Sequence, residues 1–139
     1  MKKKISILGS TGSIGLTSLK IIDKKKSFFK VNLLSANKNF NLICSQIKKY
    51  KPNYFVITDS KIFLKVKEKY KKNKIIVLNN FNFRNSISKS DITITAIPGI
   101  DGLLPTLSIT KFSKKILIAN KESIICGWSL IQKEAIKNK

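Results

Sequence analysis

The sequence predicts an α/β fold in which helices cover both faces of a doubly wound, mostly parallel sheet. Short runs of apolar or β-branched residues alternate with stretches of helical periodicity along the whole chain. The runs are almost continuously apolar, as is typical of strands that are buried on both faces. A glycine-rich turn joins the first run to the first helical stretch, where such sheets bind their ligands.

Six runs have the length and composition of strands. They span residues 5–8, 31–34, 54–57, 75–78, 92–95 and 116–118. Because parallel strands need a crossover connection, we expect a helix after each of them.

Apolar residues at helical spacing predict five helices. They span residues 13–24, 40–50, 62–70, 103–111 and 123–137. Asp59 or Ser60 is the expected cap of the third helix. Lysines fall mostly at the ends and outer faces of these helices, so we interpret them as a solvated surface.

Length and charge narrow the function classes. The 139 residues fit one domain, and the hydrophobic content of 42% supports a folded core. The absence of histidine excludes Ser-His-Asp and Cys-His catalytic sites within these residues. A net charge of +21 would favour binding of a polyanion such as nucleic acid. However, proteins that recognise bases depend on arginine, and Arg84 is the only arginine among the 28 basic residues. Enrichment in Lys, Ile and Asn indicates drift toward A/T-rich codons, so we expect no nucleic-acid partner.

Targeting signals are weak. The apolar run after Lys2 to Lys4 is shorter than that of a signal peptide, and no stretch reaches the length of a membrane span. Cys44 and Cys126 lack CxxC spacing, and Cys44 is expected to be a reduced core thiol because it lies on an apolar helical face. The sequence therefore predicts a cytoplasmic protein that is not bound to a membrane.

The first loop of interest spans residues 9–15 and indicates a nucleotide-binding, Rossmann-like domain. Its glycines at intervals of three permit a tight turn and a close approach of backbone to ligand. The amide groups at the following helix start favour a pyrophosphate. The spacing is GxxGxxG rather than GxGxxG, and a purely structural turn is the alternative. The candidate cofactor-binding residues here are Gly9, Thr11, Gly12, Ser13, Ile14 and Gly15.

The second loop spans residues 35–39 and favours NADP over NAD. Domains that bind NAD place an acidic residue at the end of the second strand, where it holds the ribose 2′-hydroxyl. No acid stands here, and Lys38 lies where a 2′-phosphate would be attracted. In a lysine-rich chain Lys38 could also be there by chance. Asn37, Lys38 and Asn39 are the candidates.

Two further loops lie at strand ends. Residues 96–102 could line the adenine or nicotinamide side of a crevice, or simply form a turn into the next helix. Asn120, Lys121 and Glu122 form a polar cluster after the sixth strand. Lys121 could hold a substrate phosphate or carboxylate, and Glu122 could instead cap the helix.

Three segments together resemble one enzyme family. Residues 7–15, 102–107 and 117–123 are similar to the N-terminal NADPH-binding domain of the 1-deoxy-D-xylulose 5-phosphate reductoisomerases. The resemblance covers essentially the whole chain, so residues 1–139 are expected to be that domain alone. The metal-binding catalytic domain and the C-terminal domain of the family are expected to lie outside it.

The resemblance also implies roles for individual residues. Residues 11–14 would contact the NADPH pyrophosphate and ribose, and Lys38 and Asn39 the 2′-phosphate. Asn120 and Glu122 would lie near the cofactor, and Lys121 near the substrate. The chain departs from the family at Asn37, where glycine is common, and in the loop 96–102, where Pro98, Ile100 and Asp101 replace smaller residues.

The family's reaction rearranges 1-deoxy-D-xylulose 5-phosphate and reduces the product with NADPH to 2-C-methyl-D-erythritol 4-phosphate, an isoprenoid precursor. It requires a divalent metal (Mg, Mn or Co), whose carboxylate ligands are not expected in this chain. The resemblance therefore implies an NADPH-binding fragment with no catalytic residue of its own and no turnover alone. The full enzyme is expected to be a homodimer.

Two alternatives remain open at this point. The first is another NADP-dependent oxidoreductase, such as a semialdehyde or homoserine dehydrogenase. The second is a non-catalytic Rossmann module that binds RNA or another polyanion through its lysines.

Overall fold

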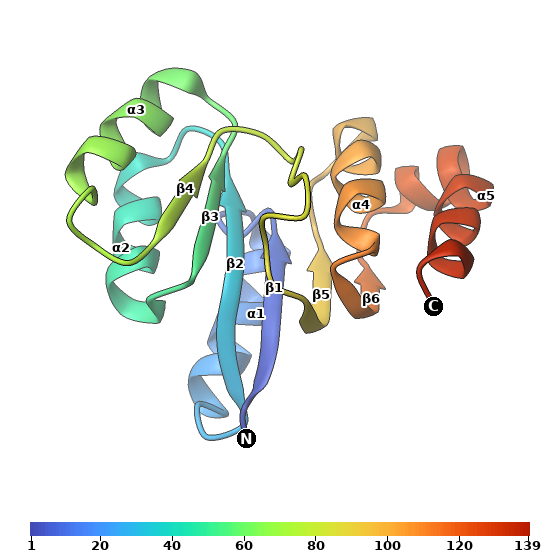
Figure 1. Ribbon diagram of the computed structural model, residues 1–139, viewed down its shortest axis with the longest axis horizontal. Coiled ribbons are helices and arrows are strands. Elements are labelled where there is room, and N and C mark those ends of the chain that lie inside the picture. Colours follow the sequence, from blue (N-terminus) through green and yellow to red (C-terminus); the bar gives the residue numbers. More distant parts are fainter.

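The computed structural model describes residues 1–139 and contains a single six-stranded sheet (Figure 1). The strands are β1 (Lys3–Leu8), β2 (Phe29–Ala36), β3 (Tyr54–Ile57), β4 (Ile76–Leu78), β5 (Ser90–Thr95) and β6 (Ser113–Ile118). The helices are α1 (Ser13–Lys24), α2 (Phe40–Tyr50), α3 (Ser60–Lys69), α4 (Leu103–Thr110) and α5 (Lys121–Lys137), with a short 3₁₀ turn, η1 (Ile100–Gly102), before α4. The predicted α/β class and all eleven predicted elements are confirmed.

The sheet has the order β4-β3-β2-β1-β5-β6, and every neighbouring pair is parallel. The chain builds outward from β1 to β4 and then returns to the other side of β1 to form β5 and β6. The loops that follow β1 and β5 therefore leave the sheet in opposite directions. This topological switch point is where doubly wound sheets open a ligand-binding crevice.

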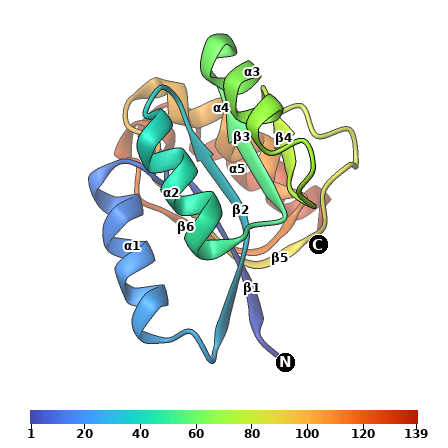
Figure 2. The same cartoon turned by 90° about the vertical axis from the view of Figure 1, so that its left-hand side faces the viewer.

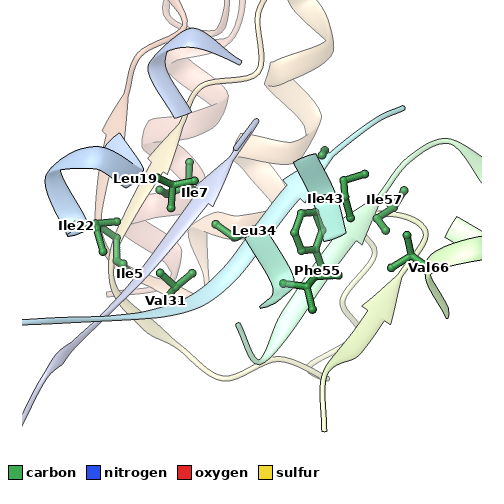
Figure 3. Close-up of a cluster of buried hydrophobic side chains, with 12 residues drawn as sticks. Ile5, Ile7, Leu19, Ile22, Val31, Leu34, Ile43, Phe55, Ile57 and Val66 are labelled. Atoms are coloured by element: carbon green, nitrogen blue, oxygen red, sulfur yellow. The ribbon is translucent and has the colours of Figure 1, made fainter. Parts of the chain in front are cut away.

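Helices α1, α2 and α3 cover one face of the sheet, as Figure 2 shows from the side. Their inward residues meet those of β1, β2 and β3 in one apolar cluster (Figure 3). Ile7, Leu34, Ile43, Phe55 and Val66 are fully buried within it. Burial of such side chains stabilises the fold by roughly 1.5–3 kcal/mol each. It also holds α1 and α2 against the face of the sheet that β1 and β2 form.

The opposite face is covered differently from our expectation. No helix follows β4; residues 79–89 instead cross the sheet as an irregular segment and share this face with α4 (Figure 1). Phe83 from this segment stacks edge-to-face on Phe112, and both are buried against Leu8 and Leu33. The expectation that each strand precedes a helix is therefore wrong at β4, because aromatic packing replaces the helix there.

A buried polar network anchors this irregular segment. The side-chain amide of Asn32, in β2, donates to the Ser88 carbonyl at 3.1 Å and to Ser90 Oγ at 2.9 Å. Its oxygen accepts a hydrogen bond from Asn53 Nδ2 at 2.8 Å. Because every polar atom of Asn32 has a partner, this amide is tolerated inside the sheet.

The lysines on α3 face solvent, and neither cysteine belongs to the buried core. Lys65, Lys67 and Lys69 are exposed on α3, as expected for a solvated face. Both cysteines are free thiols; Cys44 is half-buried rather than within the core, and Cys126 is exposed. None of the helices combines the length and the apolar character needed to cross a membrane.

Candidate functional site

A cleft of about 830 Å³ lies at the switch point, at the carboxyl ends of the strands. Sixteen residues line it, from the loops after β1, β2, β3 and β5, from the start of α4 and from the segment after β4. They are Gly9, Thr11, Gly12, Ser35, Ala36, Asn37, Thr58, Phe81, Ala96, Ile97, Pro98, Ile100, Asp101, Leu103, Leu104 and Pro105. Asp101 is the only charged residue among them, so the cleft is equipped mainly to bind and orient a ligand.

The turn after β1 depends on two glycines. Gly9 has φ +82°, and a Cβ there would lie 2.8 Å from the Ala96 carbonyl oxygen at the end of β5. Gly15 is buried on α1, where a Cβ would lie 2.7 Å from Ser10 Cα. These two glycines let the turn close tightly and let α1 start directly against it.

Gly12 differs from both, because the space around it is open. The nearest atom to a Cβ there would be the Gly9 oxygen at an ordinary 3.6 Å. Gly12 is the N-cap of α1, no side chain caps this helix, and its first turn holds no acid. The amide groups of Ser13 and Ile14 are therefore available at the positive end of the helix dipole, beside the cleft, where they can bind an anion.

The end of β2 and the loop that follows it place Ser35, Ala36 and Asn37 in the cleft. Asn37 does not have a positive φ, so the turn does not need the glycine that the family commonly has there. Asn37 Oδ1 accepts a hydrogen bond from Thr58 Oγ1 at 3.1 Å. Lys38 is exposed and follows Asn37 directly, but it is not among the residues that line the cleft. Asn39 caps α2 by accepting a hydrogen bond from the Leu42 amide at 3.1 Å. No acidic side chain stands at this strand end.

The loop after β5 forms the opposite wall. Ile97 lines the cleft, and so do Pro98, Ile100 and Asp101, the three residues at which this loop departs from the family pattern. Gly99 has φ +73° with nothing near its Cβ position. Gly99 is thus required for its positive φ and not for a close contact.

The loop after β6 lies beside the cleft rather than in it. Asn120 is buried; its Nδ2 donates to the carbonyls of Ile97 and of Gly99, the latter at 2.7 Å. Its Oδ1 accepts from the Ser123 amide at 2.9 Å, so Asn120, not Glu122, caps α5. Lys121 is exposed and Glu122 is half-buried in the first turn. Asn120 therefore ties the wall of the cleft to α5.

Sequence reasoning missed three residues at this site. Thr58 and Phe81 line the cleft, but Phe81 lies in the irregular segment, where no periodicity marks it. Gln46 is buried beneath the glycine turn and hydrogen-bonds to Ser10. A polar residue on the otherwise apolar face of α2 was the available signal for Gln46.

The two carboxyl groups with shifted pKa values, those of Asp23 and Asp91, lie outside the cleft. The hydrogen bond from Lys49 holds the pKa of Asp23 below its ordinary value, against the opposing effect of burial. The hydrogen bond from Lys114 likewise lowers the pKa of Asp91.

No cluster of three or more His, Cys, Asp or Glu side chains could hold a metal ion. The residues present therefore do not fit a divalent-metal site.

Comparisons with known proteins agree with this geometry. The family model described as 1-deoxy-D-xylulose 5-phosphate reductoisomerase matches residues 5–127. A protein of that name from Pelagibacter ubique is 48% identical over 99% of this chain, which spans 36% of its length. One from Clostridium tetani is 41% identical over 99% of this chain and 37% of its own length. The chain thus spans about a third of these relatives.

Solved structures are similar as well. The enzyme of that name from Zymomonas mobilis in complex with NADPH has a TM-score of 0.87 and 26% identity, covering 99% of this chain and 37% of that chain. A structure of DOX-P reductoisomerase in complex with NADPH, fosmidomycin and magnesium has the same TM-score and identity over 98% of this chain and 34% of that chain.

Proposed function

The chain belongs to the 1-deoxy-D-xylulose 5-phosphate reductoisomerase family, and we propose that residues 1–139 form its NADPH-binding domain. The observation that supports this most directly is the uncapped start of α1 at the mouth of the cleft. Ser13 and Ile14 would hold the pyrophosphate there through their backbone amides, and Gly12 would let it approach because it has no side chain. NADPH, when bound, supplies the hydride for the reduction.

The second loop supports a preference for NADPH over NADH. The 2′-phosphate of NADPH would lie beyond β2, near Asn37, Lys38 and Asn39. A carboxylate at this point would repel that phosphate, and none is present. The exposed ammonium group of Lys38 would attract it. Gly9 and Gly15 would shape the turn, Thr11 would contact the pyrophosphate or ribose from within the cleft, and Lys38 would contribute charge.

The loop after β6 would contribute residues to the binding of the substrate. We assign Lys121 to the phosphate of 1-deoxy-D-xylulose 5-phosphate, and Glu122 to the neighbourhood of the cofactor. Asn120 would act there by holding the loop after β5, given its hydrogen bonds to Gly99 and Ser123. The described residues do not fit a divalent metal, so we assign no step through a metal to them. With substrate and Mn²⁺, residues 1–139 alone are expected to oxidise no NADPH.

We further propose that the complete enzyme is a cytoplasmic homodimer that acts on this small phosphorylated sugar, and that the lysine surface is not a nucleic-acid interface. The solved relative that contains fosmidomycin supports a small-molecule site. RNA binding that survives the blocking of Gly12 would instead support the polyanion alternative.

Replacing Gly12 tests the proposed function. Gly12→Val adds a side chain in open space, with Gly12 at φ −79° and ψ 174°, so the fold is expected to persist. The added methyl groups would cover the helix amides and weaken NADPH binding by at least about tenfold, or about 1.4 kcal/mol. Fluorescence titration with NADPH measures this, with Thr17→Val, on the exposed side of α1, as the matched control. Equal affinity of all three proteins would refute the proposal.

A further inference from the structure

Gln46 is an unusual residue for its position. It lies on the inward face of α2, next to Ile43 and Ile47, and only 4% of it is exposed. A buried amide is costly unless both its oxygen and its nitrogen are hydrogen-bonded. In this protein both are, and both bonds go to one residue.

That residue is Ser10, within the glycine turn. Gln46 Oε1 accepts a hydrogen bond from Ser10 Oγ at 2.7 Å, and Gln46 Nε2 donates to the Ser10 carbonyl at 2.9 Å. The two opposed bonds also fix the orientation of the amide, because a flipped amide would set its oxygen against the Ser10 carbonyl. Ser10 itself is completely buried between Gly9 and Thr11.

Hydrogen bonds from the glycine turn also reach the end of β2. The Ser10 amide donates to the Ser35 carbonyl at 2.8 Å, and the Gly9 amide donates to Ser35 Oγ at 2.9 Å. Ser35 stands two residues before Asn37, where the 2′-phosphate side of the cleft begins. Gln46 thus holds the turn after β1 directly, and Ser10 and Gly9 connect that turn to the end of β2.

We propose that Gln46 is a positioning residue for NADPH. It holds the Ser10 peptide, and with it the turn that leads to the free amides of Ser13 and Ile14, which would face the pyrophosphate. Through the hydrogen bond from the Ser10 amide to Ser35 it also supports the end of β2, which would face the 2′-phosphate. The inference rests on the proposed function of the cleft. Gln46 does not line the cleft, so it acts through Ser10 and touches no ligand.

The test compares Gln46→Met with Asn53→Ala in the 139-residue chain. Gln46→Met preserves the volume of the side chain and removes both hydrogen bonds. Asn53→Ala removes the bond to Asn32, away from the cleft, and reports the effect of losing a buried amide contact in general. For each protein the Kd for NADPH is measured by calorimetry below its melting temperature.

We expect Gln46→Met to raise the Kd by at least about tenfold and Asn53→Ala to change it by less than about twofold. Amide hydrogen exchange in the free protein should rise at residues 9–12 in Gln46→Met only. A folded Gln46→Met with the Kd of the unaltered chain would overturn the inference and leave the proposed function intact. An unaltered chain that binds no NADPH would overturn both.

If Gln46→Met does not fold, Ser10→Ala decides the question. It removes the hydroxyl group that donates to Gln46 Oε1 at 2.7 Å and that also lies 3.0 Å from the Ser35 carbonyl, and it leaves the Ser10 peptide in place, including its hydrogen bond from the Ser10 amide to Ser35. A several-fold higher Kd for NADPH is expected. An unchanged Kd in folded Ser10→Ala would overturn the inference.

Discussion

The glycines of the turn after β1 show how equal spacing can serve unequal purposes. Gly9 is needed for its positive φ and for the close approach of β5, and Gly15 for the contact between α1 and the turn. Gly12 needs neither, because its φ is ordinary and its surroundings are open. A side chain at Gly12 would harm only a ligand, so this glycine is the one that points to function.

Asp23 gives a residue-level prediction about pH. Its carboxylate accepts hydrogen bonds from Lys49 on α2 and from Tyr50, and the Lys49 bond lowers its pKa below the ordinary 3.8. A lowered folded-state pKa stabilises the fold fully above about pH 4 and progressively less as the pH falls through the folded value. Asp23→Asn should therefore lose at most about 1 kcal/mol at pH 7, the range of exposed ion pairs.

As the pH falls below about 4 and through the lowered folded-state pKa of Asp23, the two proteins should converge in stability, since the carboxylate then becomes protonated in the unaltered chain as well. Urea unfolding of both proteins between pH 2.5 and 7 measures this. A difference that stays constant across the whole range would show that the charge of Asp23 is not responsible.

At the level of elements, Asn120 joins α5 to the wall of the cleft. It caps the helix and also donates to the carbonyls of Ile97 and Gly99. Asp59 caps α3 in the same way, by accepting from the Ile62 amide at 3.0 Å, but α3 begins outside the cleft. The two caps form a matched pair with different surroundings.

Asn120→Ala and Asp59→Ala should each lower the free energy of unfolding by about 0.5–2 kcal/mol through loss of the cap. Only Asn120→Ala should also weaken NADPH binding, because it frees the loop after β5. Urea unfolding and NADPH titration of both variants separate the two effects. Equal NADPH affinity in the two variants would show that the loop holds its shape without Asn120.

Elements with a clear apolar period could be predicted from the sequence almost to the residue. Helices α1 and α2 and strand β3 begin and end where their periodicity does. Strand β2 is longer than predicted, because Phe29 and Lys30 precede its apolar run and because Ser35, which ends that run, stays buried with a hydrogen bond from the Gly9 amide. The segment 79–89 has no period at all, since Asn32 and the Phe83–Phe112 contact, both remote in sequence, determine its path.

The site was predictable to a similar degree. The glycine turn and the acid-free end of β2 are local patterns, and both lie in the cleft. The hydrogen bonds by which Asn120 holds the loop after β5 and Gln46 holds Ser10 could not be predicted from the sequence, because they join residues that lie 21 to 36 positions apart. Sequence patterns identify where a ligand would meet the backbone, whereas the side chains that hold this backbone become evident only in three dimensions.

For the molecule as a whole, the net charge of +21 and the cleft lead to different expectations about ligands. A general attraction to phosphates would favour any anionic nucleotide and would weaken steeply with salt. A built site would instead discriminate between nucleotides that differ by a single phosphate. We expect the second behaviour of this protein, because the helix amides and the acid-free end of β2 would recognise specific phosphates of the nucleotide.

The most direct test is therefore the affinity of the 139-residue chain for NADPH and for NADH, measured by calorimetry at physiological ionic strength. We predict that one NADPH binds per chain, at least about tenfold more tightly than NADH, or by about 1.4 kcal/mol. Failure to bind NADPH, or equal affinity for the two cofactors, would contradict the account.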